Sequence, residues 1–206
     1  MSAARRRGQY ALRRAVRPAA AVLVLALLVL ADRAGLFGRA PQPDVETYDA
    51  GVFRVVRVVD GDTLDVDTPD TVTGRAHTRI RLWGVDTPET TKPDARPQHF
   101  GPQASAFTRR CCRGKPVRLE LVKGKTRGKY KRLLAYVHLP DGTMLNAELI
   151  AAGFGYADPR FVHPRLGEFA RLQRKAMREK RGLWKNVRPD DLPYYYRTGR
   201  HTLDLP

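Results

Sequence analysis

The stretch VFRVVRVVDGDTLDVDT, from Val52 to Thr68, decides how the chain begins to fold. It is rich in β-branched residues and carries Asp60 and Gly61 in its middle. Asp-Gly between two apolar runs is a strong signal for a tight β-hairpin, because these residues tolerate the positive φ angles of the turn. We therefore expect strands over 53–59 and 63–67 that pair with each other.

Further strands and helices are expected downstream of the hairpin. β-branched or alternating runs predict strands, whereas helix formers that end at glycine or carry an apolar stripe predict helices. The expected strands are Thr78–Val85, Pro116–Val122 and Leu133–Leu139, and the expected helices lie within Gln103–Gly114, Met144–Gly153 and Gly167–Trp184. This order favours an α+β, mainly β fold. Five short strands suit a small barrel such as the five-stranded OB-fold, although the pattern alone does not force that topology.

The chain is strongly basic. Its 206 residues suit one domain with tails, and its formal net charge is +17. Such a charge indicates a polyanionic partner, either nucleic acid or anionic lipid, unless the basic residues only form a solvated surface. The cysteines Cys111 and Cys112 are adjacent and lack metal-ligand spacing, so neither is expected to be functional, although an intermolecular disulfide stays open for an exported domain.

Residues 1–37 have the pattern of a targeting segment. Arginines precede the apolar run AAAVLVLALLVLA, Ala19–Ala31. A basic region followed by a short apolar one is typical of an export signal, and this run is shorter than the ~20 residues of a comfortable transmembrane helix. A cleaved signal and an uncleaved anchor both stay open. We expect the protein to be exported, and either secreted or associated with a membrane through residues 19–31.

Three regions are expected after this segment. Residues 38–51 contain Pro, Asp and Gly with little periodicity and are predicted to be a linker. Residues 52–186 should form the ordered domain, and 187–206 a tail. The tyrosines 194–196 could pack back on the domain or lie against a membrane, and the sequence does not decide between these.

Carboxylates stand at the ends of two expected strands, in VDGDT (Val59–Thr63) and VDTPET (Val85–Thr90). Each motif alone is typical of an ordinary turn. If the first and third strands share a barrel mouth, however, Asp62 and Asp86 converge on a hard-oxygen site suited to Ca²⁺ or Mg²⁺. Pro88 keeps Thr87 extended, so that the Thr87 carbonyl could face the same cation, and Glu89 could hold a water. No histidine or cysteine cluster indicates zinc.

Two arginines accompany the strands that lead to this mouth, Arg81 on the third strand and Arg132 just before the last one. A phosphodiester attacked by water gains negative charge, which forked arginine donors stabilise better than lysine. Arg81 precedes the second acidic motif, and Arg132 precedes the strand LLAYVHL, directly after Lys129 and Tyr130. In so basic a chain the alternative is that each is a surface arginine.

Several motifs together resemble one known family. VVDGDT, RLWGVDTPET, FGPQASAF, KYKRLLAYV and NAELIAAG occur in the order and approximate spacing of the staphylococcal-nuclease-like (thermonuclease) domain, from about Phe53 to about Asn186. The resemblance implies an OB-fold barrel with three helices. It also implies a monomeric, Ca²⁺-dependent nuclease that hydrolyses DNA and RNA and leaves 3′-phosphates. A non-catalytic nucleic-acid-binding module is the alternative, although such copies typically lack the acids or arginines.

The resemblance also implies roles by position. It assigns Ca²⁺ binding to Asp62, Asp86 and Thr87, with Asp60 as a nearby acid, and phosphate binding to Arg81 and Arg132. Glu89 matches the residue proposed as general base or water-orienting group. Lys129 and Tyr130 match residues that contact a terminal phosphate.

The chain departs from the family at two places. The family usually has Asp-x-Tyr-Gly-Arg before its last strand, whereas this chain has Gly128, Lys129, Tyr130, Lys131 and Arg132, which could change how Arg132 is aimed. The segment FGYADPRFVHPR also differs. Its Tyr156 and Phe161 could stack on bases, or one of them could serve only packing.

Overall fold

The computed structural model describes residues 43–90, 98–199 and 201, together with residues 22, 24–27 and 30 of the N-terminal segment. The chain divides into two compact units, Met1–Pro41 and Gln42–Pro206. The predicted targeting segment, residues 1–37, lies largely outside the described residues. Among those described, no helix combines the length and the apolar character needed to cross a membrane.

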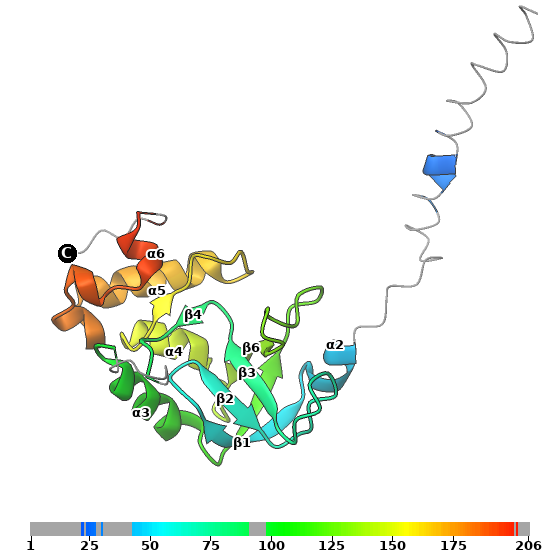
Figure 1. The fold of residues 1–206 in the computed structure, drawn as a ribbon, viewed down its shortest axis with the longest axis horizontal. Helices are drawn as coiled ribbons and strands as arrows, with labels where there is room; N and C mark the ends of the chain where they lie inside the picture. Colours follow the sequence, from blue (N-terminus) through cyan, green and yellow to red (C-terminus); the bar gives the residue numbers. More distant parts are fainter. Residues whose placement is uncertain are drawn as a thin grey trace, which may run out of the picture. The chain divides into compact units, whose positions relative to one another are not determined.

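Five strands close into a barrel, as predicted for an OB-fold (Figure 1). The strands are β1 (Val52–Val58), β2 (Thr63–Val66), β3 (Thr78–Leu82), β5 (Pro116–Glu120) and β6 (Leu133–His138). Their order around the barrel is β1-β2-β3-β6-β5, with β3 and β6 parallel and the other neighbours antiparallel. The register pairs Thr63 with Arg81, and Arg81 with Leu134. Arg81 therefore lies beside the start of β2, where the first acidic motif ends.

The predicted hairpin of β1 and β2 is confirmed. Val59 N donates to the Thr63 carbonyl oxygen at 2.9 Å, which closes the turn that contains Asp60 and Gly61. Apolar side chains such as Leu64 and Ile80 point inward and are fully buried. Burial of one such side chain stabilises a fold by about 1.5–3 kcal/mol.

Three longer helices cover the barrel, also as predicted: α3 (Gly101–Cys112), α4 (Leu145–Ala151) and α5 (Leu166–Arg178). Buried Asn146 fixes α4. Its Nδ2 donates to the carbonyl oxygens of Trp83 (3.0 Å) and Ala135 (3.2 Å), and its Oδ1 accepts from Val137 N (2.9 Å). Cys112 is a buried, free thiol on α3, and burial raises its pKa to about 12, so it packs as an apolar group.

The predicted third strand is split at Gly84. This glycine has φ +74°, and a Cβ there would meet the His163 ring at 2.5 Å. After this turn the chain continues as β4 (Val85–Asp86), which pairs with β7 (Tyr156–Ala157) outside the barrel. The split places Asp86 between the barrel and the C-terminal helices.

The prediction of a linker over residues 38–51 is wrong for its described part. Residues Pro43–Tyr48 form the helix α2, and Tyr48 is fully buried with its hydroxyl donating to the Pro69 carbonyl oxygen at 3.1 Å. Six residues are too few for a helical period to be recognised from sequence, so only tertiary packing reveals this element. The ordered domain thus begins before β1.

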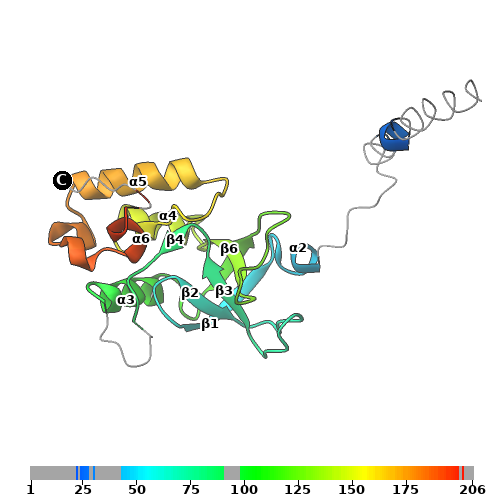
Figure 2. The same cartoon turned by 45° about the horizontal axis from the view of Figure 1, so that its top comes forward.

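The described part of the C-terminal tail packs back on the domain through Tyr195 and Tyr196, whereas Tyr194 is 50% exposed. The 3₁₀ turn η1 (Gly182–Lys185) ends the predicted domain, and the tail contains the 3₁₀ turn η2 (Pro189–Asp191) and the short helix α6 (Tyr194–Arg197). Figures 1 and 2 both show α6 beside α5, and Gln173 Nε2 of α5 donates to the Tyr196 hydroxyl at 3.2 Å. Tyr195 is only 1% exposed.

A buried histidine predicts acid sensitivity of the fold. His163 lies among the rings of Trp83, Tyr136 and Phe169, and its Nε2 has no hydrogen-bond partner among the described residues. Burial lowers the pKa of His163 below its usual ~6.5. The unfolded chain therefore takes up the proton first, so stability is complete above about pH 6.5 and falls as the pH drops through the folded pKa.

Urea unfolding at about pH 7.5 and about pH 5 checks this for the wild type and for His163→Phe. The free energy of unfolding should fall more steeply toward acid in the wild type. Equal slopes in the two proteins would contradict the assignment.

Candidate active site

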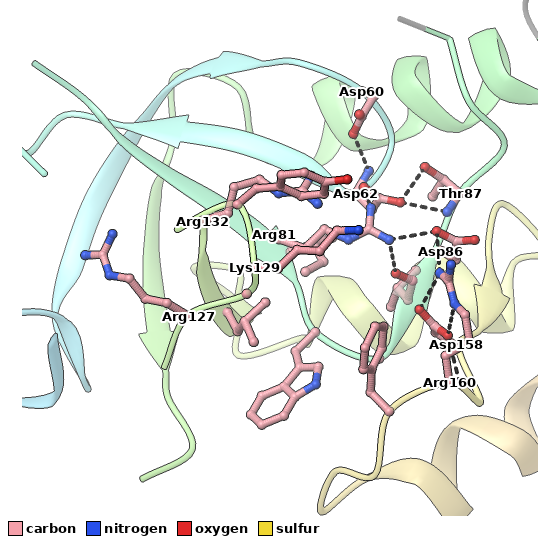
Figure 3. A pocket seen from close by; sticks show the side chains of 18 of the residues that line it. Asp60, Asp62, Arg81, Asp86, Thr87, Arg127, Lys129, Arg132, Asp158 and Arg160 are labelled. Atoms are coloured by element: carbon pink, nitrogen blue, oxygen red, sulfur yellow. Dashed lines mark hydrogen bonds and ion pairs between the residues drawn. The ribbon is translucent and has the colours of Figure 1, made fainter. Parts of the chain in front are cut away.

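One cavity at the barrel mouth is lined by all the residues that were predicted to bind the metal ion, bind phosphate or position water. Its volume is about 750 Å³. Figure 3 shows that carboxylates and guanidinium groups gather on one side of it. The predicted residues among its lining are Asp60, Asp62, Arg81, Asp86, Thr87, Glu89, Lys129, Tyr130 and Arg132.

The turn after β1 fixes Asp62, which is 2% exposed. Its Oδ2 accepts hydrogen bonds from Thr87 N (2.7 Å) and Thr87 Oγ1 (3.0 Å). A Cβ on Gly61 would lie 2.7 Å from Thr87 Oγ1, so glycine is required for this close approach. The two acidic motifs are thereby joined, as the sequence predicted for strands that share a mouth.

Arg81 bridges the two predicted metal carboxylates (Figure 3). Its Nη1 pairs with Asp62, while its Nη2 donates to Asp86 Oδ1 at 2.7 Å and to the Val85 carbonyl oxygen at 3.0 Å. Because one guanidinium contacts both acids, Asp62 and Asp86 face a common cationic position.

The donor set at this position fits Ca²⁺. Asp62 and Asp86 offer carboxylate oxygens and Thr87 offers a carbonyl oxygen, which are the hard ligands that Ca²⁺ prefers. Over the described ranges, no group of three or more His, Cys, Asp or Glu side chains forms a metal site. A Ca²⁺ ion at this position would need the backbone carbonyl and water as ligands besides the two acids.

Arg160 and Tyr195 complete the surroundings of Asp86, and sequence reasoning missed both. Arg160 Nη2 lies 3.2 Å from Asp86 Oδ1, and the Tyr195 hydroxyl donates to Asp86 Oδ2 at 3.0 Å. Arg160 also forks onto Asp158 at 2.8 and 2.7 Å and lies over the Tyr195 ring. The only local signal was the sequence Asp158-Pro-Arg160, which is equally typical of a turn.

Asp60 lies in the same turn as Asp62 and supports it. Its Oδ1 accepts from Asp62 N at 3.1 Å. Burial raises the pKa of Asp60, and the charge of Arg81 opposes this rise. We therefore assign it to the frame of the turn rather than to the cation position.

Arg132 reaches the cavity from the start of β6. Its Nη1 donates to Thr63 Oγ1 at 3.3 Å, and its guanidinium lies 5.7 Å from the centroid of the Tyr130 ring. Burial and the neighbouring charge of Arg81 lower the pKa of Arg132. Arg81 and Arg132 thus repel each other, and an anion bound between them would neutralise this repulsion.

Glu89 and the loop residues Lys129 and Tyr130 also line the cavity. Glu89 N donates to Gln98 Oε1 at 2.9 Å, and Gln98 N returns a bond of the same length to the Glu89 carbonyl oxygen. This pair fixes the Glu89 backbone near the start of α3. Tyr130 is 68% exposed, with Lys129 Nζ 4.7 Å from its ring centroid.

Of the two aromatic residues proposed to stack on bases, only Phe161 is available. Tyr156 is buried and packs edge-on against Trp184, with ring centroids 5.4 Å apart. Phe161 is 45% exposed and lines the cavity. Tyr156 therefore serves packing.

Comparison with known proteins agrees with this geometry. Residues 79–186 match the family described as staphylococcal nuclease homologue. A thermonuclease of Staphylococcus hyicus is 35% identical over 170 residues, which cover 81% of this chain and 93% of the relative. The chain belongs to the staphylococcal nuclease family.

Two further relatives show similar identity. A thermonuclease of Staphylococcus intermedius is 38% identical over 136 residues, 65% of this chain and 76% of the relative. An uncharacterized endonuclease of Escherichia coli is 33% identical over 137 residues, 66% of this chain and 78% of the relative. Membership of this family makes the chain a nuclease, a hydrolase of phosphodiester bonds. The matched range ends before Tyr195, so the contact from α6 lies outside it.

Proposed function

We propose that the protein is an exported, Ca²⁺-dependent nuclease that cleaves DNA, RNA or both and leaves 3′-phosphates. The observation that carries this proposal is the convergence of Asp62, Arg81 and Asp86 on one point of a cavity that Arg132 and Glu89 also line. Guanidinium forks, carboxylates and a separate acid within one cavity are the parts that hydrolysis of a phosphodiester needs.

The arginines bind and stabilise the reacting phosphate. Arg81 and Arg132 present forked donors from neighbouring strands, and the phosphoryl oxygens accept these hydrogen bonds. As the phosphorus gains a fifth oxygen neighbour, the negative charge on these oxygens increases and the bonds strengthen. When bound at Asp62, Asp86 and the Thr87 carbonyl, Ca²⁺ supplies further electrostatic stabilisation of that charge.

Glu89 positions the attacking water and accepts its proton. The water oxygen forms a bond to phosphorus, and the bond from phosphorus to the 5′ oxygen breaks. The 5′ oxygen takes up a proton from solvent water and leaves as a hydroxyl, so the phosphate stays on the 3′ side. Lys129 and Tyr130 would contact a terminal phosphate of the bound strand.

Export and membrane attachment are supported by the N-terminal sequence. Arginines precede the apolar run Ala19–Ala31, as in an export signal. N-terminal sequencing of the protein recovered from medium and from membranes separates a cleaved signal from an uncleaved anchor. Recovery of the intact protein from the cytoplasm alone would refute export.

The full-length chain is expected to cleave single-stranded DNA and RNA with millimolar Ca²⁺ and to lose this activity in excess chelator. Arg81 neutralises Asp62 and Asp86 in the structure. When Arg81 instead contacts the phosphate, the two carboxylates need another cation to balance their charge. The assay follows acid-soluble nucleotides, with a known nuclease in the same buffers as control. Binding of nucleic acid in chelator without cleavage in Ca²⁺ would instead identify a non-catalytic binding module.

A further inference from the structure

The turn that carries Arg132 is held in a conformation that its sequence disfavours. Lys131 has φ +59°, in the left-handed region that glycine adopts freely and lysine does not. Lys131 N donates to the Gly128 carbonyl oxygen (2.9 Å), and Gly128 N donates to the Arg132 carbonyl oxygen (3.0 Å). The staphylococcal-nuclease-like domain usually has glycine at position 131, which suits this conformation.

Arg127, which also lines the cavity, holds the backbone of this turn. Its Nη1 donates to the Lys131 carbonyl oxygen at 2.9 Å. The same nitrogen contacts both carboxylate oxygens of Asp70, at 2.9 and 2.8 Å. Its Nε and Nη2 fork onto Asp44 at 2.7–3.0 Å. Figure 3 shows the Arg127 side chain pointing away from the acids around Arg81.

Both acids that hold Arg127 are themselves fixed. Asp44 lies on α2 and also accepts from Thr126 Oγ1 at 2.7 Å. Asp70 Oδ1 accepts from the backbone N–H groups of Val72 (3.0 Å) and Thr73 (3.1 Å). The Arg127 and Asp70 side chains are almost completely buried, at 11% and 1% exposure. One guanidinium therefore joins three separate segments at the base of the turn.

We propose that Arg127 is a positioning residue that aims Arg132 into the cavity. It replaces the aspartate and glycine that the family usually carries at positions 128 and 131. The Lys131 carbonyl that it binds immediately precedes Arg132, so loss of that bond frees the turn to leave the left-handed conformation. This inference rests on the proposed role of Arg132 in stabilising the reacting phosphate.

The test compares Arg127→Lys, Lys131→Gly and the double variant in the full chain. Lysine cannot bond both acids and the Lys131 carbonyl at once. Arg127→Lys should therefore lower kcat about tenfold to a hundredfold, the range of a small misplacement of a reacting group, with a smaller change in KM. Adding Lys131→Gly to Arg127→Lys should recover at least about half of the loss in log kcat, because glycine adopts the left-handed conformation without the bond from Arg127.

Arg79→Lys is the matched control. Arg79 forks onto Asp65 at 2.7 and 2.9 Å, so its replacement also weakens a half-buried ion pair, but on the barrel wall. It should leave kcat within about threefold, and Lys131→Gly should not improve it. If Arg127→Lys does not fold, Asp44→Asn, which removes one of the two acids, is tested in the same comparison.

Arg132→Lys separates this inference from the function that it rests on. An unchanged kcat in Arg132→Lys would overturn the role of Arg132 and this inference with it. A large loss in Arg132→Lys, together with wild-type kcat in Arg127→Lys, would overturn the inference alone. Failure of Lys131→Gly to rescue Arg127→Lys would reduce Arg127 to a structural role and would equally overturn it.

Discussion

Replacement of Arg81 by lysine is expected to lower kcat about 10²–10³-fold, which is the usual cost of removing one donor to a developing anion. In the structure Arg81 contacts Asp62, Asp86 and the Val85 carbonyl with a single guanidinium. An ammonium group preserves the charge but cannot form parallel bonds to two oxygens. Steady-state cleavage of single-stranded DNA at saturating Ca²⁺ measures the loss.

The comparison with Arg79→Lys shows whether the effect belongs to the site. Both arginines lie on β3 and both form carboxylate pairs, but Arg79 does not line the cavity. Circular dichroism and melting temperature should stay near those of the wild type in both variants. If kcat falls less than tenfold in Arg81→Lys, Arg81 does not stabilise the reacting phosphate.

Replacement of Glu89 by serine is the second change with a large expected effect, about 10²–10⁴-fold in kcat, as for loss of a general base. Gln98 holds the backbone of Glu89 by two hydrogen bonds, and the carboxylate adds one bond, from Thr90 N at 3.0 Å, so the fold should persist. Measured against pH, the wild-type rate should show an ionisation that Glu89→Ser lacks. That difference would show that the reaction requires the ionised carboxylate of Glu89.

Glu148→Ser is the matched control for this variant, because Glu148 is an exposed acid on α4 outside the cavity. Its kcat should stay within about twofold of the wild type. Equal activity of Glu89→Ser and Glu148→Ser would mean that a group other than Glu89 accepts the proton of the attacking water. It would also contradict the positional assignment of Glu89.

Local signals were sufficient for much of the barrel. The β1–β2 hairpin depends on residues within one short stretch, and β-branched runs with turn residues between them mark the other strands. The site acids could also be predicted, because Asp62 and Asp86 stand at the ends of strands that a barrel brings together. The structure adds that Arg81 is the group that joins them.

Contacts between distant residues could not be predicted. Asp44 meets Arg127 across 83 positions, and α2, which carries Asp44, is too short to show a helical period. Arg160 gave no signal that separates a site residue from a turn residue. In each case the folded barrel brings the two partners together, and no local pattern of the sequence shows which residues will meet.

The hydrogen bond from Tyr195 to Asp86 has a consequence for the timing of assembly. The two residues are 109 positions apart, and a ribosome makes Asp86 first. A growing chain can close its barrel and bring Arg81 to the acids before residue 195 has been added. Until then Asp86 lacks the tyrosine hydroxyl and Arg160 lacks the ring on which it lies. The surroundings of Asp86 are thus completed only after the barrel strands and both acids have been made.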